Sequence, residues 1–341
     1  MNDTETSKTI PPDYSAVRDG GAGLIDLSNR GRLLVSGSEA AQFLNGLITN
    51  DMKTLGANSW MTAAFANVQG RLLAAVRVIH REDGFVIDTE STTKETVGKL
   101  LERFTLAGDF HLSDLSEQLA HLSVQGAAAA AMLRKVLGVD LSDLDRTALA
   151  NVQWQNEPVT VLRSTHTAED GFDLFLERSA GEGLRKTFLA AGAPPVTGEV
   201  QEVLRIEAGI ARYGRDMDES NVVTETNLED AVSFTKGCYL GQEIIVRIKH
   251  RGHVAKKLTG LVIEKEATIE SGAKILSADE KEVGRVTSAT FSPQLERTIA
   301  LGYVKYDYLE PGTSVNVVNG DEGNSANVSE LPFVRGSWYR H

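Results

Sequence analysis

Thr235-Lys236-Gly237-Cys238-Tyr239-Leu240-Gly241-Gln242-Glu243 holds the only cysteine of the 341-residue chain. The two glycines favour an irregular, tightly turned backbone around Cys238, and Lys236 precedes the thiol closely. A nearby ammonium group favours the thiolate, which is the form of cysteine that acts as a nucleophile or as a ligand of soft metals. The alternative is a buried and inert cysteine, because free cysteines are among the most buried residues.

The segment KGCYLGQE (residues 236–243) resembles the signature octapeptide of the YgfZ family, which includes mitochondrial iron–sulfur maturation factors. The segment LRIEAGI (residues 204–210) is similar to one in the wider aminomethyltransferase superfamily, which contains the glycine-cleavage T-protein (GcvT). Shorter similarities to that superfamily lie at residues 25–28, 43–51, 170–173 and 299–304. Together these matches extend from about residue 24 to residue 310, which is nearly the whole chain.

The resemblance implies an α+β fold of the GcvT-like type, with antiparallel sheets and covering helices around a central folate cavity and a C-terminal β-barrel. Apolar runs at 61–68, 71–79 and 85–87 independently predict an antiparallel meander. Short apolar runs beyond Gly252, separated by glycine and acidic turns, predict an all-β barrel or sandwich. We expect a disordered tail (1–15), a folate-binding region (16–250) and a barrel (251–335). The folate-binding region would contain two α+β subdomains, one of them including about residues 52–110.

Apolar residues that recur at about 100° per residue predict a helix from about residue 199 to 211. Glu207 falls near the centre of its apolar arc, and an unpaired buried carboxylate is strongly destabilising. Glu207 is therefore either in a structural ion pair, with Arg212 or Arg215 as candidates, or a ligand of a polar molecule. In the superfamily that this segment resembles, the glutamate binds the pterin ring of tetrahydrofolate, to which a carboxylate can offer two hydrogen bonds.

A basic run follows the cysteine motif, with five lysine and arginine residues and no acidic residue between Arg247 and Lys257. The run is either a solvated strand face or an anion site, for which the glutamate tail of a folate is a suitable ligand. His250, His253 and Cys238 would give zinc only three ligands at poor spacing, so we expect no resident metal.

The composition of the chain argues against two classes of binding partner, nucleic acids and membranes. The net charge of −12 argues against general nucleic-acid binding, which requires a cationic surface. No run approaches the roughly 18 apolar residues of a membrane span, and the polar N-terminus lacks the features of a secretory signal. A single cysteine cannot form an internal disulfide, which fits a reducing cytosol. We therefore expect a cytoplasmic protein with no membrane partner and no stable nucleic-acid partner.

Three functions are compatible with these residues. The first, implied by the resemblance to YgfZ, is a tetrahydrofolate-binding factor that assembles or repairs iron–sulfur clusters in client enzymes. One cysteine cannot hold a cluster alone, so Cys238 would be a transient ligand shared with an iron–sulfur client or carrier protein. The second is a folate-dependent aminomethyltransferase or other one-carbon transferase. The third is a non-catalytic folate-sensing scaffold with a structural Cys238.

The resemblance also implies roles for individual residues. Cys238 and Lys236 would be the catalytic pair, and we expect Cys238 and Glu207 to open onto the same cavity. The predicted ligands of tetrahydrofolate, or of a one-carbon or polyglutamyl derivative, are Glu207, Tyr239, Gln242 and Arg247.

One expected residue is missing from the sequence. The aminomethyltransferases carry a catalytic aspartate early in the helix after the meander, in a Lys-Asp context. The matching positions in this chain are Glu95 and Thr96. Glycine-cleavage activity is therefore not expected.

Overall fold

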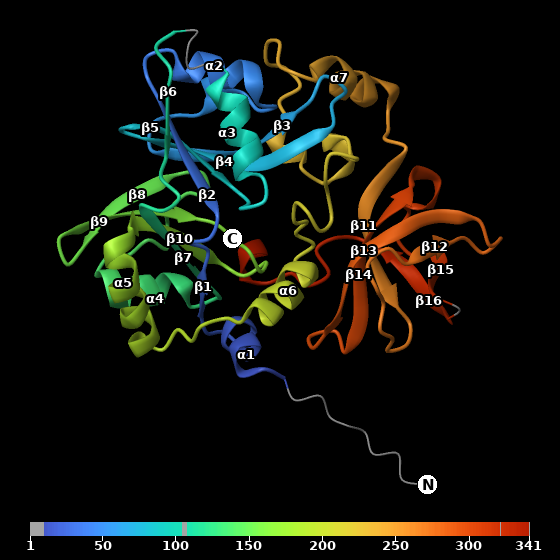
Figure 1. Ribbon diagram of the computed structural model, residues 1–341. Helices are drawn as coiled ribbons and strands as arrows, with labels where there is room; N and C mark the ends of the chain where they lie inside the picture. The colour runs from blue at the N-terminus through green and yellow to red at the C-terminus, as the bar shows by residue number, and fades with distance from the viewer. Residues whose placement is uncertain (1–9, 104–107, 321, 341) are drawn as a thin grey trace.

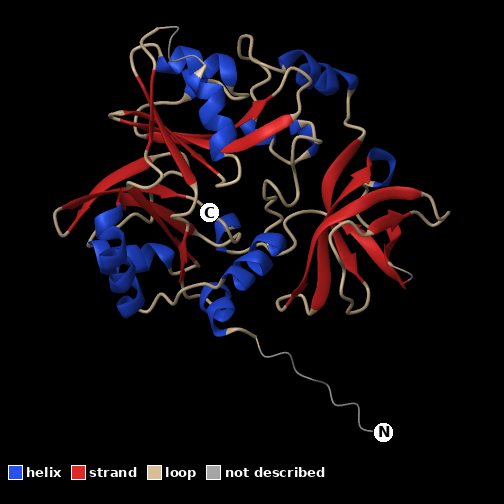
Figure 2. Cartoon of the chain, in the orientation of Figure 1, coloured by secondary structure: helices blue, strands red, loops and turns tan. Residues whose placement is uncertain are grey.

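The computed structural model describes residues 10–103, 108–320 and 322–340, and Figure 1 shows three β-structured units joined by helices and loops. Two of the units are five-stranded antiparallel sheets and the third is a closed barrel (Figure 2). This architecture confirms the predicted α+β class, with antiparallel sheets, covering helices and a C-terminal β-barrel. No helix in the described part of the chain is long and apolar enough to cross a membrane.

The first sheet is covered by two helices, α4 (Ala129–Leu137) and α5 (Arg178–Ala191). Leu133, Leu184 and Phe188 of these helices are fully buried against the sheet, as their helical spacing requires. In sheet order the strands are β1 (Gly23–Asp26), β7 (Leu119–Gln125), β10 (Gly171–Glu177), β9 (Glu157–Arg163) and β8 (Leu149–Trp154). Every residue of β7 is buried, which places this strand between two covering layers.

The second sheet contains the predicted meander and is packed by α2 (Ala40–Leu47) and α3 (Lys94–Glu102). In sheet order its strands are β3 (Ser59–Ala66), β4 (Leu72–Arg81), β5 (Gly84–Thr89), β2 (Gly31–Ser36) and β6 (His111–Asp114). The two sheets meet through an apolar cluster that includes Ile79 and Val86 of the second sheet and Leu162 and Phe175 of the first.

The third unit is a barrel in which hydrogen bonds connect every strand to two neighbours. Its strands are β11 (Lys256–Ile263), β14 (Arg297–Lys305), β13 (Glu282–Ser292), β12 (Lys274–Leu276), β15 (Ser314–Asn319) and β16 (Glu322–Ser329). Its interior is filled by aliphatic side chains such as Ile275, Val304 and Val317. Helix α6 (Gly198–Glu207) packs against β13 and β14 and joins the barrel to the rest of the molecule.

The remaining elements correct three details of the sequence prediction. Residues 1–9 of the predicted tail lie outside the described residues, but helix α1 (Pro12–Arg18) begins within the predicted tail and buries Tyr14. Helix α6 ends at Glu207 rather than near residue 211, because Gly209 adopts a φ of +67° where a Cβ would lie 2.8 Å from Leu331. The basic run belongs largely to helix α7 (Gln242–Arg251) instead of a strand.

Five single turns of 3₁₀ helix complete the described secondary structure. They are η1 (Met52–Thr54), η2 (Val223–Glu225), η3 (Glu229–Ala231), η4 (Tyr306–Tyr308) and η5 (Ser337–Tyr339).

Candidate functional site

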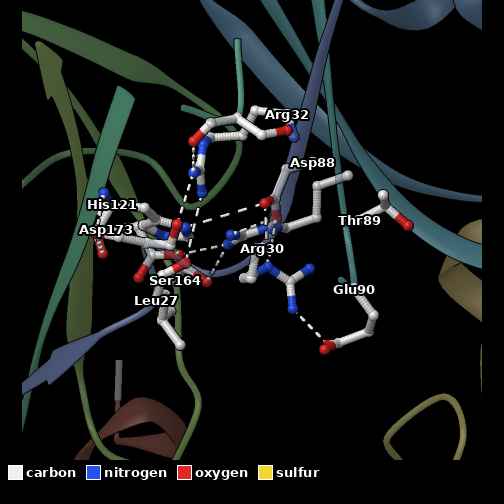
Figure 3. Close-up of polar contacts among 12 residues, drawn as sticks. Leu27, Arg30, Arg32, Asp88, Thr89, Glu90, His121, Ser164 and Asp173 are labelled. Atoms are coloured by element: carbon white, nitrogen blue, oxygen red, sulfur yellow. Dashed lines mark hydrogen bonds and ion pairs between the residues drawn. The ribbon is translucent and has the colours of Figure 1, made fainter. Parts of the chain in front are cut away.

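Charged side chains join the two sheets across their interface (Figure 3). Arg77 of β4 donates to Asp88 of β5 through Nε at 2.9 Å and to Asp173 of β10 through Nη1 at 2.5 Å. Arg30, in the loop before β2, donates to the same Asp88 at 3.0 Å and also pairs with Glu90. Since Arg77 and Asp88 belong to the second sheet and Asp173 to the first, the network fixes the sheets relative to one another.

Both aspartates of this network are fully buried and ionised. Burial acts to raise the pKa of Asp88, but the guanidinium groups of Arg30 and Arg77 outweigh it and hold the pKa well below its usual range. Burial also opposes ionisation of Asp173, whose pKa is nevertheless held well below its usual range by His166, Arg77 and His121. The carboxylates therefore keep their charge at neutral pH.

Two histidines contact Asp173 from different environments. His121 is fully buried and stacks on Phe175, and burial lowers its pKa to about 4 despite the attraction of Asp173. The side chain of His166 is 27% exposed and places Nε2 at 3.0 and 3.1 Å from the two oxygens of Asp173. A histidine that is oriented by a buried carboxylate and open on its other side is a suitable general acid or base.

His166 lines a hollow of about 170 Å³, here called the central hollow. Strand β1 and its following turn form one part of the wall, and α6 with the residues after it forms another. Several of its lining side chains carry charge or hydrogen-bonding groups: Arg30, Glu90, His166, Gln201, Arg205 and Arg212. The central hollow thus offers donors and acceptors around a small space.

A second, larger hollow of about 720 Å³ shares Ile210 and Ala211 with the central hollow. Three acidic residues line it, Glu229, Asp230 and Glu330, whereas Lys257 is its only lysine or arginine among the described residues. Helix α6 ends early, at Glu207, and the residues that follow it line the hollows: 208–211 line the larger one, and 210–212 line the central hollow.

Glu207 is fully enclosed and lines neither hollow. One of its oxygens accepts from Tyr14 at 2.8 Å and from Ser292 at 2.5 Å, and the other accepts from Arg18 Nε at 3.0 Å and Nη2 at 2.7 Å. Its ion-pair partner is thus Arg18 of α1 and neither of the two arginines considered from the sequence. Two carboxylate oxygens have about four acceptor sites, and four donors already occupy them.

Lys236 is buried in a cage of backbone carbonyls at the C-terminal end of α2. Its Nζ donates to the carbonyl oxygens of Asn45 at 2.7 Å, Ile48 at 3.0 Å and Asn50 at 2.5 Å. Burial lowers the pKa of Lys236 to about 8, so most molecules keep the ammonium form at neutral pH. Three N–H donors on three carbonyls explain why a lysine is required here, since α2 leaves its last carbonyls without helical partners.

The other motif residues surround this cage without reaching the hollows. Cys238 is exposed, whereas the Tyr239 ring is buried with Lys236 Nζ 5.1 Å from its centre. Gln242 donates to the carbonyl of Lys236 at 3.3 Å, and Arg247 is exposed on α7. The expectation that Cys238 and Glu207 share a cavity is therefore wrong, because the thiol faces solvent and the carboxylate is sealed inside a charge cluster. Their individual roles, like those of Tyr239, Gln242 and Arg247, stay predictions.

The sequence prediction missed the residues of the central hollow. Arg30, Glu90 and His166 belong to separate segments and follow no periodic pattern, and an isolated histidine carries no signal of its own. Position in the sequence is the one feature that could have pointed to them. Arg30 lies just after the superfamily-like segment 25–28, and His166 lies just before the segment 170–173. Glu95 and Thr96 lie exposed on α3, where Glu95 pairs with Lys99 rather than facing either hollow.

Sequence profiles of known families cover most of the chain. The GCVT N-terminal domain matches residues 3–236, and the glycine cleavage T-protein C-terminal barrel domain matches residues 256–335. An aminomethyltransferase of Rubrobacter xylanophilus is 32% identical over 327 residues, which span 96% of this chain and 86% of the relative. An aminomethyltransferase of Thermosipho melanesiensis is 28% identical, over 96% of this chain and 92% of the relative.

A solved structure has the same fold. The glycine cleavage system aminomethyltransferase T of Bartonella henselae superposes with a TM-score of 0.86 at 23% identity, covering 95% of this chain and 89% of that one.

Proposed function

Because this chain belongs to the glycine cleavage T-protein family, we propose that it is a folate-dependent one-carbon transferase of the aminomethyl type. The observation that supports this proposal best is the central hollow, where His166 and the Arg30–Glu90 pair surround a small space that adjoins a larger hollow. Such an arrangement suits a reaction between two molecules that approach from different sides.

The central hollow fits one part of a reduced folate. Its volume of about 170 Å³ is below that of pockets that enclose drug-sized ligands, roughly 300–1,000 Å³, so it can hold the pterin ring but not the tail. The carboxylate of Glu90 can accept from the ring's amino and N–H groups, and Gln201 can both donate and accept. Glu207 can contribute, as the resemblance implies, only if a ligand displaces one of its present donors.

The residues of this chain would bind the folate and move protons around it. When bound, tetrahydrofolate supplies the pair of nitrogens, one on the pterin ring and one just beyond it, that accept a one-carbon unit. His166, held by Asp173, is the group that can take up or return a proton at the central hollow. Glu95 cannot do so from its exposed site on α3.

Calorimetric titration with tetrahydrofolate tests the binding step. Glu90→Gln should weaken binding at least about tenfold, because a charge-assisted hydrogen bond contributes about 1.5–3 kcal/mol. Glu95→Gln is the matched control and should bind like the unmodified chain. Equal affinities of all three proteins would remove Glu90 from the site, and the absence of any binding would end the folate proposal.

The transfer step needs its own assay. The unmodified chain should form methylene-tetrahydrofolate from an aminomethyl donor, and His166→Asn should lower kcat by about 10²–10⁴-fold, the usual contribution of a general acid or base. Folate binding without any product would instead favour a folate-sensing scaffold.

We also propose a second candidate function, the YgfZ-type assembly or repair of iron–sulfur clusters with a client or carrier protein. The observation that favours it is an exposed Cys238 on a loop that Lys236 anchors to α2. A thiolate there is accessible to a cluster held mainly by a partner. In a deletion strain, Cys238→Ala should fail to restore iron–sulfur enzyme activity, whereas Ser314→Ala on the barrel should restore it. Full restoration by Cys238→Ala would exclude this function.

A further inference from the structure

The loop 164–170, between β9 and β10, carries His166 and Thr167 to the wall of the central hollow. The side chain of Gln125 on β7 holds it from the sheet side, since its Oε1 accepts from the backbone N–H of His166 at 2.8 Å. Arg18 of α1 holds it at the carbonyl of Thr167, at 2.8 Å. Ala168 has a φ of +65°, a strained value for an alanine, so the loop depends on outside contacts for its shape.

The third brace comes from the end of the chain. The hydroxyl of Ser337 donates to Glu169 Oε2 at 2.6 Å and accepts from the backbone N–H of Asp170 at 2.9 Å. The backbone N–H of Ser337 donates to the same Glu169 oxygen at 2.7 Å. The other oxygen of Glu169 pairs with Arg18 at 2.9 Å, so one buried carboxylate connects Ser337 with the α1 brace.

The residues on either side of Ser337, Gly336 and Trp338, also allow or support its contact with the loop. A Cβ on Gly336 would lie 2.3 Å from Glu169 Oε1, so only glycine lets the backbone come this close. Trp338 donates its backbone N–H to the carbonyl of Ala168 at 3.2 Å, and the guanidinium carbon of Arg146 lies 4.2 Å from the centre of its ring. This terminal segment lies beyond residue 335, where the barrel profile ends.

We propose that Ser337 is a positioning residue of the central hollow, which acts through Glu169 and Asp170 on the loop that carries His166 and Thr167. Removal of its hydroxyl leaves the buried N–H of Asp170 without an acceptor and takes one donor from Glu169. The brace from the end of the chain is then weakened, because only the backbone N–H groups of Ser337 and Trp338 still hold the loop from that side, and the loop samples other shapes. The consequence for folate rests on the function proposed above, whereas the effect on the loop does not.

Hydrogen exchange of the full-length chain tests the loop directly. In Ser337→Ala, amides of residues 164–170 should exchange at least about tenfold faster than in the unmodified protein. Ser337→Thr keeps the hydroxyl and should restore slow exchange. Ser314→Ala is the matched control, because it removes a serine hydroxyl bonded to Asn327 on the far barrel strands. Unchanged exchange in Ser337→Ala, or equal acceleration in the control, would overturn the proposal.

If Ser337→Ala does not fold, Arg146→Met replaces it, because it removes the contacts to Trp338 and leaves the serine in place. It should accelerate the same amides, and normal exchange in a folded Arg146→Met would count against the proposal. Titration with tetrahydrofolate forms the second arm, in which Ser337→Ala should bind about tenfold more weakly and Ser337→Thr normally. If the unmodified chain binds no folate, the proposed function fails while the exchange result still decides the role of Ser337.

Discussion

At the scale of single residues, the carboxylate of Glu207 is tightly constrained, because it is fully enclosed with the guanidinium of Arg18. Glu207→Gln keeps the shape of the side chain but removes one of the two negative charges that neutralise a buried arginine. Breaking a buried ion pair costs about 3–5 kcal/mol, so we expect the free energy of unfolding to fall by about 3 kcal/mol in denaturant titrations. Glu182→Gln, at an exposed pair on α5, should change it little. Equal stabilities would show that the Glu207 charge is dispensable.

The same substitution separates structure from binding. Affinity for tetrahydrofolate should be measured far below the unfolding midpoint, where the variant is fully folded. If stability falls while the affinity for tetrahydrofolate is unchanged, Glu207 is a structural residue and the prediction that it binds the pterin ring is wrong.

His121 predicts a pH dependence of stability. In the unfolded chain it takes up a proton near its ordinary pKa of 6.5, but in the folded protein only near pH 4, because burial opposes the charge. The unfolded state therefore binds more protons between these values, and the free energy of unfolding should fall as pH falls from 6.5 to 4, by about 3 kcal/mol in total. His121→Asn should flatten this slope, and exposed His111→Gln should keep it. An unchanged slope in His121→Asn would mean that other groups cause it.

The sequence could predict that Glu207 is buried but not what neutralises it. Helical periodicity placed it on the apolar face of α6, whereas Arg18 lies 189 positions away, beyond the reach of any local pattern. His121, His166 and Asp173 likewise meet only because β7 pairs with β10 and the loop before β10 folds back over it. Such contacts follow from tertiary pairing, which residue spacing does not encode.

At the scale of elements, the sequence patterns predicted which segments form strands and helices more accurately than where those elements end. Alternation and turn residues predicted the meander of β3, β4 and β5, and the structure confirms it. The end of α6 depends on Gly209 meeting Leu331 of a distant segment. Helix α7 is not among the predicted elements, because its apolar residues Ile244 and Ile245 lie beside the distant turn at Gly70, a contact that no local pattern encodes.

Lys236 ties the cysteine motif to the end of α2, and its removal should loosen both elements. Lys236→Met keeps the length of the side chain but leaves three carbonyls without a donor. We expect faster amide exchange at residues 44–50 and 233–241, and a loss of stability of about 1–3 kcal/mol for the unsatisfied groups. Lys53→Met removes an exposed lysine next to the same helix and is the control. Unchanged exchange in both segments would exclude an anchoring role for Lys236.

At the scale of the whole molecule, the fold could be predicted because the resemblance spans both sheets and the barrel. The resemblance does not predict which side chains hold these units together. Among the described residues, buried charges that hold separate parts together include Arg77 between the two sheets, Arg18 between α1 and α6, and Arg205 between α6 and the barrel. Each arginine satisfies acceptors on two or more segments, so the units should unfold together rather than independently.

Arg205 offers the sharpest test of that coupling. It donates to Asp216 at 2.7 Å and to Ser288 of β13 at 2.8 Å, while Asp216 also accepts from Thr287 of the same strand. Arg205→Met leaves the enclosed Asp216 without its guanidinium, which should cost about 3 kcal/mol and weaken the hold of α6 on the barrel.

Calorimetry should therefore show one unfolding transition for the unmodified chain and two for Arg205→Met, with the barrel unfolding separately. Arg212→Met is the matched control, because Arg212 pairs with the same Glu202 as Arg205 but its side chain is 43% exposed, against 7% for Arg205. It should keep a single transition near the original temperature, since an exposed pair adds little stability. A single, unshifted transition in Arg205→Met would show instead that apolar packing of Ile206 against Leu258 and Leu301 is enough to couple the barrel to α6.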